Sequence, residues 1–397
     1  MYIAILGRQP ALGMAELESL YGPDNTKWFS DTCAVISTDT FSLDRLGGSQ
    51  KAGRVVAELA KGDWRKTSMQ IVKQYLHEWQ HIEGKITLGI SAYGFDVSPR
   101  DIQKTGIILK NKLKEKNASL RLIPNNDTSL NSATSHHNKL GLSDNKVELL
   151  VVRARDGRVI VAESIGAQNI TAYTKRDQER PKRDAFVGML PPKLAQIIVN
   201  LSGAKKFGTL WDPFCGTGVL LQEALLMGID VYGSDISEKM IDYSEKNLEW
   251  LRRIYDASHG GPKSMWYDLR VGDATAIEFI NKHTAPLGAV ACETYLGQPF
   301  SAPPSPSKLA EVQKNCDYII GSFLKNIHPQ LAPGTPLCIA VPAWRDAAGH
   351  FTHLKLTSQL DQLGYTRRSL HHVRNADLLY YREDQVVARE LLVLSKS

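Results

Sequence analysis

The stretch Trp211-Asp212-Pro213-Phe214-Cys215-Gly216-Thr217-Gly218 decides the fold of this 397-residue chain. Apolar residues precede it, two glycines stand one residue apart within it, and the helix-like run from Val219 to Met227 follows it. A strand, a tight glycine turn and a helix start in this order bring backbone N–H groups close to a nucleotide-like ligand. The sequence therefore predicts such a binding turn here.

The residue types in this turn narrow the class of ligand. A dinucleotide fingerprint requires a third glycine where Leu221 stands, so that pattern is incomplete. Asp212 lies at the end of the strand, where its carboxylate would repel a pyrophosphate but would suit the cationic amino group of S-adenosylmethionine. The turn thus favours S-adenosylmethionine as the cofactor.

Two further acids follow at the ends of the next two expected strands. Asp235 is placed to accept hydrogen bonds from ribose hydroxyls, and Asp273 is placed to accept from the adenine amino group. Each acid alone is equally well explained as a helix cap. Three acids at successive strand ends, combined with the glycine turn, favour a methyltransferase instead. The predicted cofactor residues are Asp212, Phe214, Cys215, Gly216, Gly218, Asp235, Ile236, Asp273 and Ala274.

The order of the expected strands and helices predicts two kinds of architecture. Up to about residue 170, short strands and amphipathic helices indicate an α+β region. From Thr209 onward, strands and helices alternate, which is typical of a mainly parallel sheet with its ligand at the carboxyl ends of the strands. A helix is expected near Phe351–Leu363, and the final strands Thr366–His372 and Gln385–Leu394 predict one antiparallel edge.

Charge separates the two halves of the chain. The net charge is +6, with 28 Lys and Arg against 21 Asp and Glu in residues 1–200 and 20 against 21 in residues 201–397. A basic excess confined to one half indicates a polyanion held by one domain and modified by another. The five cysteines form no Cys-x-x-Cys pair, so a zinc site is not indicated, and a reducing, cytoplasmic setting fits best.

Basic residues in two places are candidates for contacts with RNA phosphates. The lysines of the helix after Pro99 are equally consistent with an ordinary solvated face. Arg176 to Arg183 combines mixed charge with Pro181 and predicts an extended linker between domains. The predicted RNA-binding residues are Lys110, Lys112, Arg121, Arg176, Arg180, Arg183 and Lys193.

Four motifs together resemble the THUMP-domain tRNA guanosine N2-methyltransferases, the archaeal and eukaryotic group that acts on guanosine-10. They are Met1-Tyr2-Ile3-Ala4-Ile5-Leu6-Gly7, the connector Arg176-Asp177-x-x-Arg180-Pro181-x-Arg183, the run Gly188 to Gln196, and Asp212 to Gly218. The resemblance implies an α/β fold with a Rossmann-like methyltransferase domain after an α+β ferredoxin-like and THUMP region. It also implies S-adenosylmethionine as donor, tRNA as substrate and, for eukaryotic members, a small activating protein.

On this basis we expect four segments in the chain. Residues 1–60 form the ferredoxin-like part, 61–170 the THUMP-like RNA-binding domain, 171–190 a basic linker, and 191–397 the methyltransferase domain.

The family's motif for the target base is Asp/Asn-Pro-Pro-Phe/Tyr, and this chain departs from it in Cys292-Glu293-Thr294-Tyr295-Leu296-Gly297. Aligned on the aromatic residue, Cys292 replaces the acid. Aligned on the acid, Glu293 stands in with a longer side chain and Tyr295 moves one position earlier. We favour the second register, in which Glu293 accepts from the exocyclic amine and Tyr295 stacks on the flipped base.

The chemistry leaves alternatives open. Adenine N6 in RNA or DNA carries the same kind of amine as guanosine N2. A chain whose Glu293 is a surface acid would instead be an RNA-binding protein with a degenerate methyltransferase domain.

Overall fold

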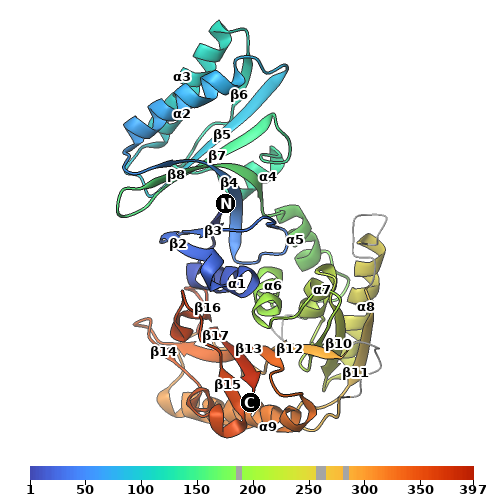
Figure 1. The fold of residues 1–397 in the computed structure, drawn as a ribbon. Helices are drawn as coiled ribbons and strands as arrows, with labels where there is room; N and C mark the ends of the chain where they lie inside the picture. Colours follow the sequence, from blue (N-terminus) through green and yellow to red (C-terminus); the bar gives the residue numbers. More distant parts are fainter. Residues whose placement is uncertain (185–189, 256–264, 280–285) are drawn as a thin grey trace. The chain divides into compact units, whose positions relative to one another are not determined.

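The computed structural model describes residues 1–184, 190–255, 265–279 and 286–397. The chain divides into two compact units, Met1–Pro10 with Tyr21–Ala172, and Ala11–Leu20 with Tyr173–Ser397. Each unit has its own sheet, an α+β sheet in the first and a Rossmann-like α/β sheet in the second (Figure 1). The predicted fold class is therefore confirmed.

The first unit is built on an eight-stranded sheet with the order β2-β3-β1-β4-β8-β7-β5-β6. Helices α2 and α3 lie on the same face of it and bury apolar side chains such as Tyr75 and Leu109 against β5 and β7 (Figure 1). Strand β4 pairs with both β1 and β8. The strands of the expected segments 1–60 and 61–170 therefore belong to one continuous sheet. The elements are β1 Tyr2–Leu6, β2 Thr26–Ser30, β3 Cys33–Ile36, β4 Ser49–Leu59, α2 Trp64–Trp79, β5 Lys85–Tyr93, α3 Pro99–Glu115, β6 Ser119–Leu122, α4 Ser132–His137, β7 Lys146–Arg153 and β8 Val159–Ala167.

The second unit contains, in the described part of the chain, a sheet with the order β11-β10-β9-β12-β13-β17-β15 and two short additional strands. Helices α6 and α7 pack on one face, and α9 packs on the other (Figure 1). The elements are α5 Ile170–Gln178, α6 Pro192–Leu201, β9 Thr209–Asp212, α7 Val219–Leu226, β10 Asp230–Asp235, α8 Glu238–Ile254, β11 Tyr267–Val271, β12 Leu287–Glu293, α9 Pro306–Ile327, β13 Pro336–Arg345, β14 Phe351–Thr352, β15 Tyr365–Arg367, β16 Leu379–Tyr380 and β17 Val387–Lys396.

The parallel part of this sheet runs from β11 to β13, as predicted. The predicted antiparallel edge is confirmed, because the final strands β15 and β17 pair antiparallel at one end of the sheet. Strand β17 is antiparallel to both β13 and β15 and lies between them, so β15 forms the edge. This insertion places side chains of β17 next to the carboxyl end of β13.

Two local predictions are wrong. Residues Phe351–Leu363 form β14 and two short 3-10 turns, because the Asp317 carboxylate holds the N–H groups of Lys355 and Leu356. The predicted linker 171–190 begins as helix, since α5 continues to Gln178. The Asn169 side chain accepts from Ala172 N–H at 2.9 Å and caps this helix.

Helix α1, Pro10–Tyr21, belongs to the second unit for residues Ala11–Leu20, although the strands before and after it belong to the first. The Asn200 side chain donates to Glu16 at 2.7 Å, which ties α1 to α6. The Glu18 carboxylate accepts from the backbone N–H groups of His371 and His372. These buried acids explain why α1 is held by the second unit.

Candidate active site

Asp212 is the last residue of β9, and only 2% of its surface is exposed. One carboxylate oxygen accepts from Phe214 N–H at 3.0 Å, which starts the loop. Burial raises the pKa of the Asp212 carboxyl well above its usual value, and the carboxylates of Asp235 and Glu293 raise it further. A buried carboxylate in such surroundings is stabilised by a cationic ligand.

The two glycines give the loop its shape. Gly216 has φ +52° and Gly218 has φ +81°, a region that L side chains rarely adopt. Gly216 N–H donates to the Asp235 carboxylate at 3.0 Å, and Gly218 begins α7. A Cβ atom on Gly218 would lie 3.0 Å from Ser244 Oγ on α8, so this glycine also allows α7 and α8 to pack closely.

Asp235 and Asp273 both hold backbone N–H groups. Asp235 accepts from Gly216 and also from Ser237 N–H at 2.9 Å, so it joins the turns after β9 and β10. Asp273 accepts from both the N–H and the hydroxyl of Thr275 at 2.8 Å. Both carboxylates therefore stabilise the turns that follow their strands, and Ser237 rather than Asp235 is the N-cap of α8. A carboxylate has about four acceptor positions, so capacity for a ligand remains on both residues.

These strand ends surround one cavity of about 690 Å³, within the roughly 300–1,000 Å³ typical of ligand sites. Eight of the nine predicted cofactor residues line it, and Gly218 supports the start of α7 behind them. The lining comprises Leu190, Asp212, Pro213, Phe214, Cys215, Gly216, Thr217, Val219, Leu220, Asp235, Ile236, Asp273, Ala274, Thr275, Glu293, Thr294, Tyr295, Leu296, Gly297, Tyr318 and Ile319.

The turn after β12 brings both predicted catalytic residues to the same cavity. Glu293 accepts from Arg389 Nε at 2.6 Å, and Tyr295 is 40% exposed. Thr294 is buried and donates to the Ala340 carbonyl through both its N–H and its hydroxyl, each at 3.0 Å. Cys292 is fully buried in the core of the second unit, and burial raises the pKa of its thiol. The carboxylate at the cavity is thus that of Glu293.

Several lining residues were not predicted from the sequence. Tyr318 and Ile319 come from α9, more than 80 residues after the first strand of the sheet. Tyr318 is 73% exposed and belongs to none of the sequence motifs, so the sequence carried no signal for it. Arg389 carried no signal, because its contact with Glu293 depends on the insertion of β17.

The predicted RNA-binding residues fall into two groups. Lys110, Lys112, Arg121 and Arg183 are exposed, and Lys193 is half-buried with its ammonium over the Tyr173 ring. Arg176 is not available to phosphate. It is buried and binds Glu223 through Nε at 2.7 Å and Nη2 at 3.1 Å. The sequence could not show this pairing, which makes Arg176 a structural residue.

The prediction that Arg180 binds RNA is also wrong, because only 3% of its surface is exposed. Burial lowers the pKa of its guanidinium, although the charge of Asp177 opposes this effect. Among the described residues its three guanidinium nitrogens have no hydrogen-bond partner. In this arrangement its side chain does not reach a phosphate at the surface.

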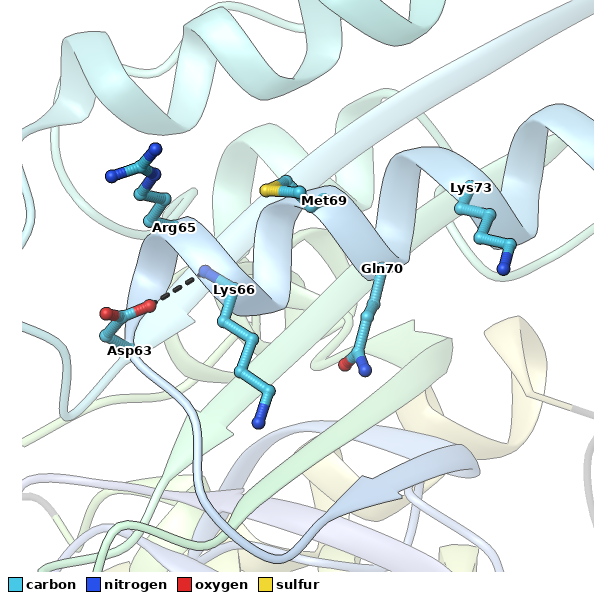
Figure 2. A pocket seen from close by; sticks show the side chains of 6 residues that line it. All are labelled: Asp63, Arg65, Lys66, Met69, Gln70 and Lys73. Atoms are coloured by element: carbon cyan, nitrogen blue, oxygen red, sulfur yellow. Dashed lines mark hydrogen bonds between the residues drawn. The ribbon is translucent and has the colours of Figure 1, made fainter.

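Figure 2 shows a second hollow, of about 330 Å³, along α2 in the first unit. Three cationic side chains line it, Arg65, Lys66 and Lys73, and none of them was predicted to bind RNA. The Asp63 carboxylate accepts from Lys66 N–H at 2.7 Å and so caps the helix. The face is therefore cationic on balance, like the exposed lysines of α3.

Within the described ranges, no group of three or more His, Cys, Asp or Glu side chains could hold a metal ion. No helix in the same ranges combines the length and the apolar character that a membrane span requires. All five cysteines are free and buried.

A comparison of folds finds TrmN from Thermus thermophilus, with a TM-score of 0.52 at 15% identity, covering 100% of this chain and 99% of that one. At this identity the likeness concerns the fold alone. Both the first unit and the Rossmann-like second unit have counterparts in that structure, since the alignment is full length.

Comparisons of sequence find relatives over shorter stretches. A tRNA (guanine(10)-N2)-dimethyltransferase of Methanothermobacter thermautotrophicus is 31% identical over 172 residues, 43% of this chain and 44% of the relative. One of Pyrococcus abyssi is 44% identical over 89 residues, 22% of this chain and 23% of the relative. This chain thus aligns with less than half the length of these curated relatives.

A family model covers the end of the connector, α6, the glycine turn and α8. Residues 180–255 match the model described as "RMKL-like, methyltransferase domain". The match includes Asp212, Gly216 and Asp235, which line the cavity at the ends of β9 and β10. Residues 180–255 of the second unit are thus similar to an RMKL-like methyltransferase domain.

Proposed function

We propose that this protein uses S-adenosylmethionine to methylate the N2 amine of a guanosine in tRNA, of the position-10 type. The observation that carries the proposal is one cavity in which Asp212, Asp235 and Asp273 meet Glu293 and Tyr295. A cationic cofactor and an amine substrate both require acceptors, and this cavity supplies them from four adjacent strand ends. The names of the sequence relatives support tRNA and guanine-10 as the target.

The residues present fit S-adenosylmethionine. Asp212 is a buried carboxylate whose pKa is raised by burial and by two like charges, so a cation beside it relieves an unfavourable arrangement. Asp235 would accept from the ribose hydroxyls and Asp273 from the adenine amine. When bound, the cofactor supplies an electrophilic methyl group on a sulfonium.

Glu293 and Tyr295 would position the target base. The N2 lone pair of guanine is delocalised into the ring, so orientation of the amine supplies much of the rate. The Glu293 carboxylate would accept from this amine and take up the proton that nitrogen loses once the new N–C bond has formed. Tyr295 would stack on the flipped base and offset part of an unstacking cost of a few kcal/mol.

The first unit would hold the tRNA as a ferredoxin-like part, residues 1–60, followed by a THUMP-like part, residues 61–170. Support comes from the basic excess of the first half of the chain and from the exposed lysines of α3 and the cationic hollow of α2 (Figure 2). Residues 171–190 would connect it to the methyltransferase domain, 191–397. Five free, buried cysteines support a cytoplasmic setting.

The test is transfer of a tritiated methyl group from S-adenosylmethionine to total tRNA, followed by digestion to nucleosides and mass spectrometry. Labelled N2-methylguanosine or N2,N2-dimethylguanosine is expected. Labelled N6-methyladenosine would move the target to adenine. Salt-sensitive tRNA binding without any transfer would mark an RNA-binding protein with an inactive methyltransferase domain. Adding a small partner protein to the same assay tests whether the chain alone is sufficient.

A further inference from the structure

The Glu293 carboxylate forms an ion pair that crosses three adjacent strands. Glu293 ends β12 and lies opposite Ala340 of β13, and Arg389 of β17 lies opposite Pro342, two residues further along β13. Side chains at directly opposed positions point to the same face of a sheet, and residues two apart on a strand share that face. Glu293 and Arg389 therefore meet on one face, above the carboxyl end of β13.

The contact is close and shielded from solvent. Arg389 Nε donates to Glu293 Oε1 at 2.6 Å, and the two side chains are 10% and 14% exposed. Among the described residues, Glu293 Oε2 has no hydrogen bond. One oxygen of the carboxylate is thus held by a guanidinium, while the other remains available at the cavity.

The backbone of the same turn is held separately. The Thr294 N–H and hydroxyl both donate to the Ala340 carbonyl, so the chain direction after Glu293 is fixed without a proline. A glutamate has one more rotatable bond than an aspartate, and nothing in the backbone restrains that bond. The side chain of Glu293 needs a restraint of its own, and Arg389 provides it.

We propose that Arg389 is a positioning residue, which orients the Glu293 carboxylate so that Oε2 faces the amine of the target base. This inference rests on the proposed function of the cavity. It goes beyond that proposal because Arg389 lies on β17, outside every motif that relates the chain to other methyltransferases.

The test compares Arg389→Met and Arg389→Lys with a matched control, Arg367→Met. Arg367 binds Glu390 at 3.0 Å on the other face of the sheet, so its loss also breaks a shielded Arg–Glu pair next to Arg389. Breaking either pair removes a guanidinium from a shielded carboxylate and lowers thermal stability, although Glu390 keeps its contact with His353 Nδ1 at 2.7 Å. Only the loss of Arg389 should change methyl transfer.

We expect Arg389→Met to lower kcat by about 100-fold, as for a misplaced reacting group, with KM for tRNA and affinity for S-adenosylmethionine within threefold of wild type. Arg389→Lys should recover part of kcat, since a lysine retains the charge but not the planar fork of donors. Arg367→Met should retain wild-type kcat at a temperature where it is folded.

A kcat that falls equally in Arg389→Met and Arg367→Met would overturn the proposal, because the effect would then be structural. A crystal structure of Arg389→Met gives a second readout that needs no activity. Glu293 should have turned away from the cavity, and an unmoved Glu293 carboxylate rejects the positioning role. If the wild-type protein transfers no methyl group to tRNA, the proposed function fails, and the crystal structure still decides the role of Arg389.

Discussion

The turns after β9 and after β12 lie on adjacent strands and face the same cavity, but they are built differently. The first, Asp212 to Gly218, is shaped by glycine backbone conformations, by the bond from Phe214 N–H to Asp212 two residues away, and by the bond from Gly216 N–H to Asp235, 19 residues away. The second, Glu293 to Gly297, is held by contacts with β13 and β17, which lie 46 and 96 residues away in sequence. A locally built turn can be recognised from sequence alone, whereas a turn held by distant strands cannot.

The largest effect should follow from removing the acid of the second turn. Glu293→Ala should lower kcat by roughly 10²–10⁴-fold, the usual contribution of a positioned proton acceptor. Affinity for S-adenosylmethionine, measured by calorimetry, should stay within a few-fold. Wild-type turnover in this variant would show that the second turn does not take part in the chemistry.

Asp212→Ala, in the first turn, should weaken the binding of S-adenosylmethionine, whereas Glu293→Ala lowers kcat. The loss of one charge-assisted hydrogen bond, about 1.5–3 kcal/mol, corresponds to roughly 10- to 150-fold weaker binding of S-adenosylmethionine. Asp212→Asn is the matched control, because it retains the bond to Phe214 N–H while removing the charge. Unchanged affinity in both variants would contradict the assignment of Asp212 to the cofactor.

Gly218→Ala tests the backbone of the first turn. Its left-handed φ and the approach of Ser244 should cost about 1–3 kcal/mol of stability, measured by denaturant unfolding. Gly321→Ala is the control, since a Cβ there on α9 meets nothing within 4 Å and should stabilise the helix by roughly 0.5–1 kcal/mol. Equal stabilities of the two variants would mean that the turn tolerates a side chain.

The raised pKa of Asp212 predicts a pH dependence of cofactor binding. Burial disfavours the charged carboxylate, so the free protein loses stability as pH rises from the ordinary carboxyl range, about pH 4, through the raised pKa. A bound cation favours the charged form. The thermal shift caused by S-adenosylmethionine should therefore grow with pH in this window, with affinity rising at most about tenfold per unit for one proton released.

Calorimetry in buffers of different ionisation enthalpy measures the released proton directly. Asp212→Asn should abolish both the release and the pH dependence. A release that persists in this variant would assign the proton to another group.

Thr294→Val, in the second turn, should have the smallest effect, a small decrease in stability. The loss of one hydroxyl bond to Ala340 costs about 1 kcal/mol, or about 2–4 °C in Tm for a unit of this size. Thr366→Val, at an exposed position, should change Tm by less than about 1–2 °C. A larger loss of kcat than of stability in Thr294→Val would show that this threonine also orients Glu293.

The same contrast explains which predictions from the sequence were correct. The strand–turn–helix at Asp212 and the acids at Asp235 and Asp273 follow from local patterns, and the structure brings all three to one cavity. Arg389 was missed because its partner is set by the position of β17 within the sheet. Arg176 was misassigned because the pairing with Glu223 depends on how α5 and α7 pack, which single-sequence patterns do not contain.

Helix α1 has a consequence for how the two units can be studied. Because Ala11–Leu20 belongs to the second unit while Met1–Pro10 belongs to the first, no single cut in the chain separates them. A fragment that starts at Tyr173 would lose the Glu16 acceptor of the Asn200 side chain and the Glu18 acceptors of the His371 and His372 N–H groups. Supplying Ala11–Leu20 as a separate peptide, or joining it to the fragment by a flexible linker, is the rational route to an isolated second unit.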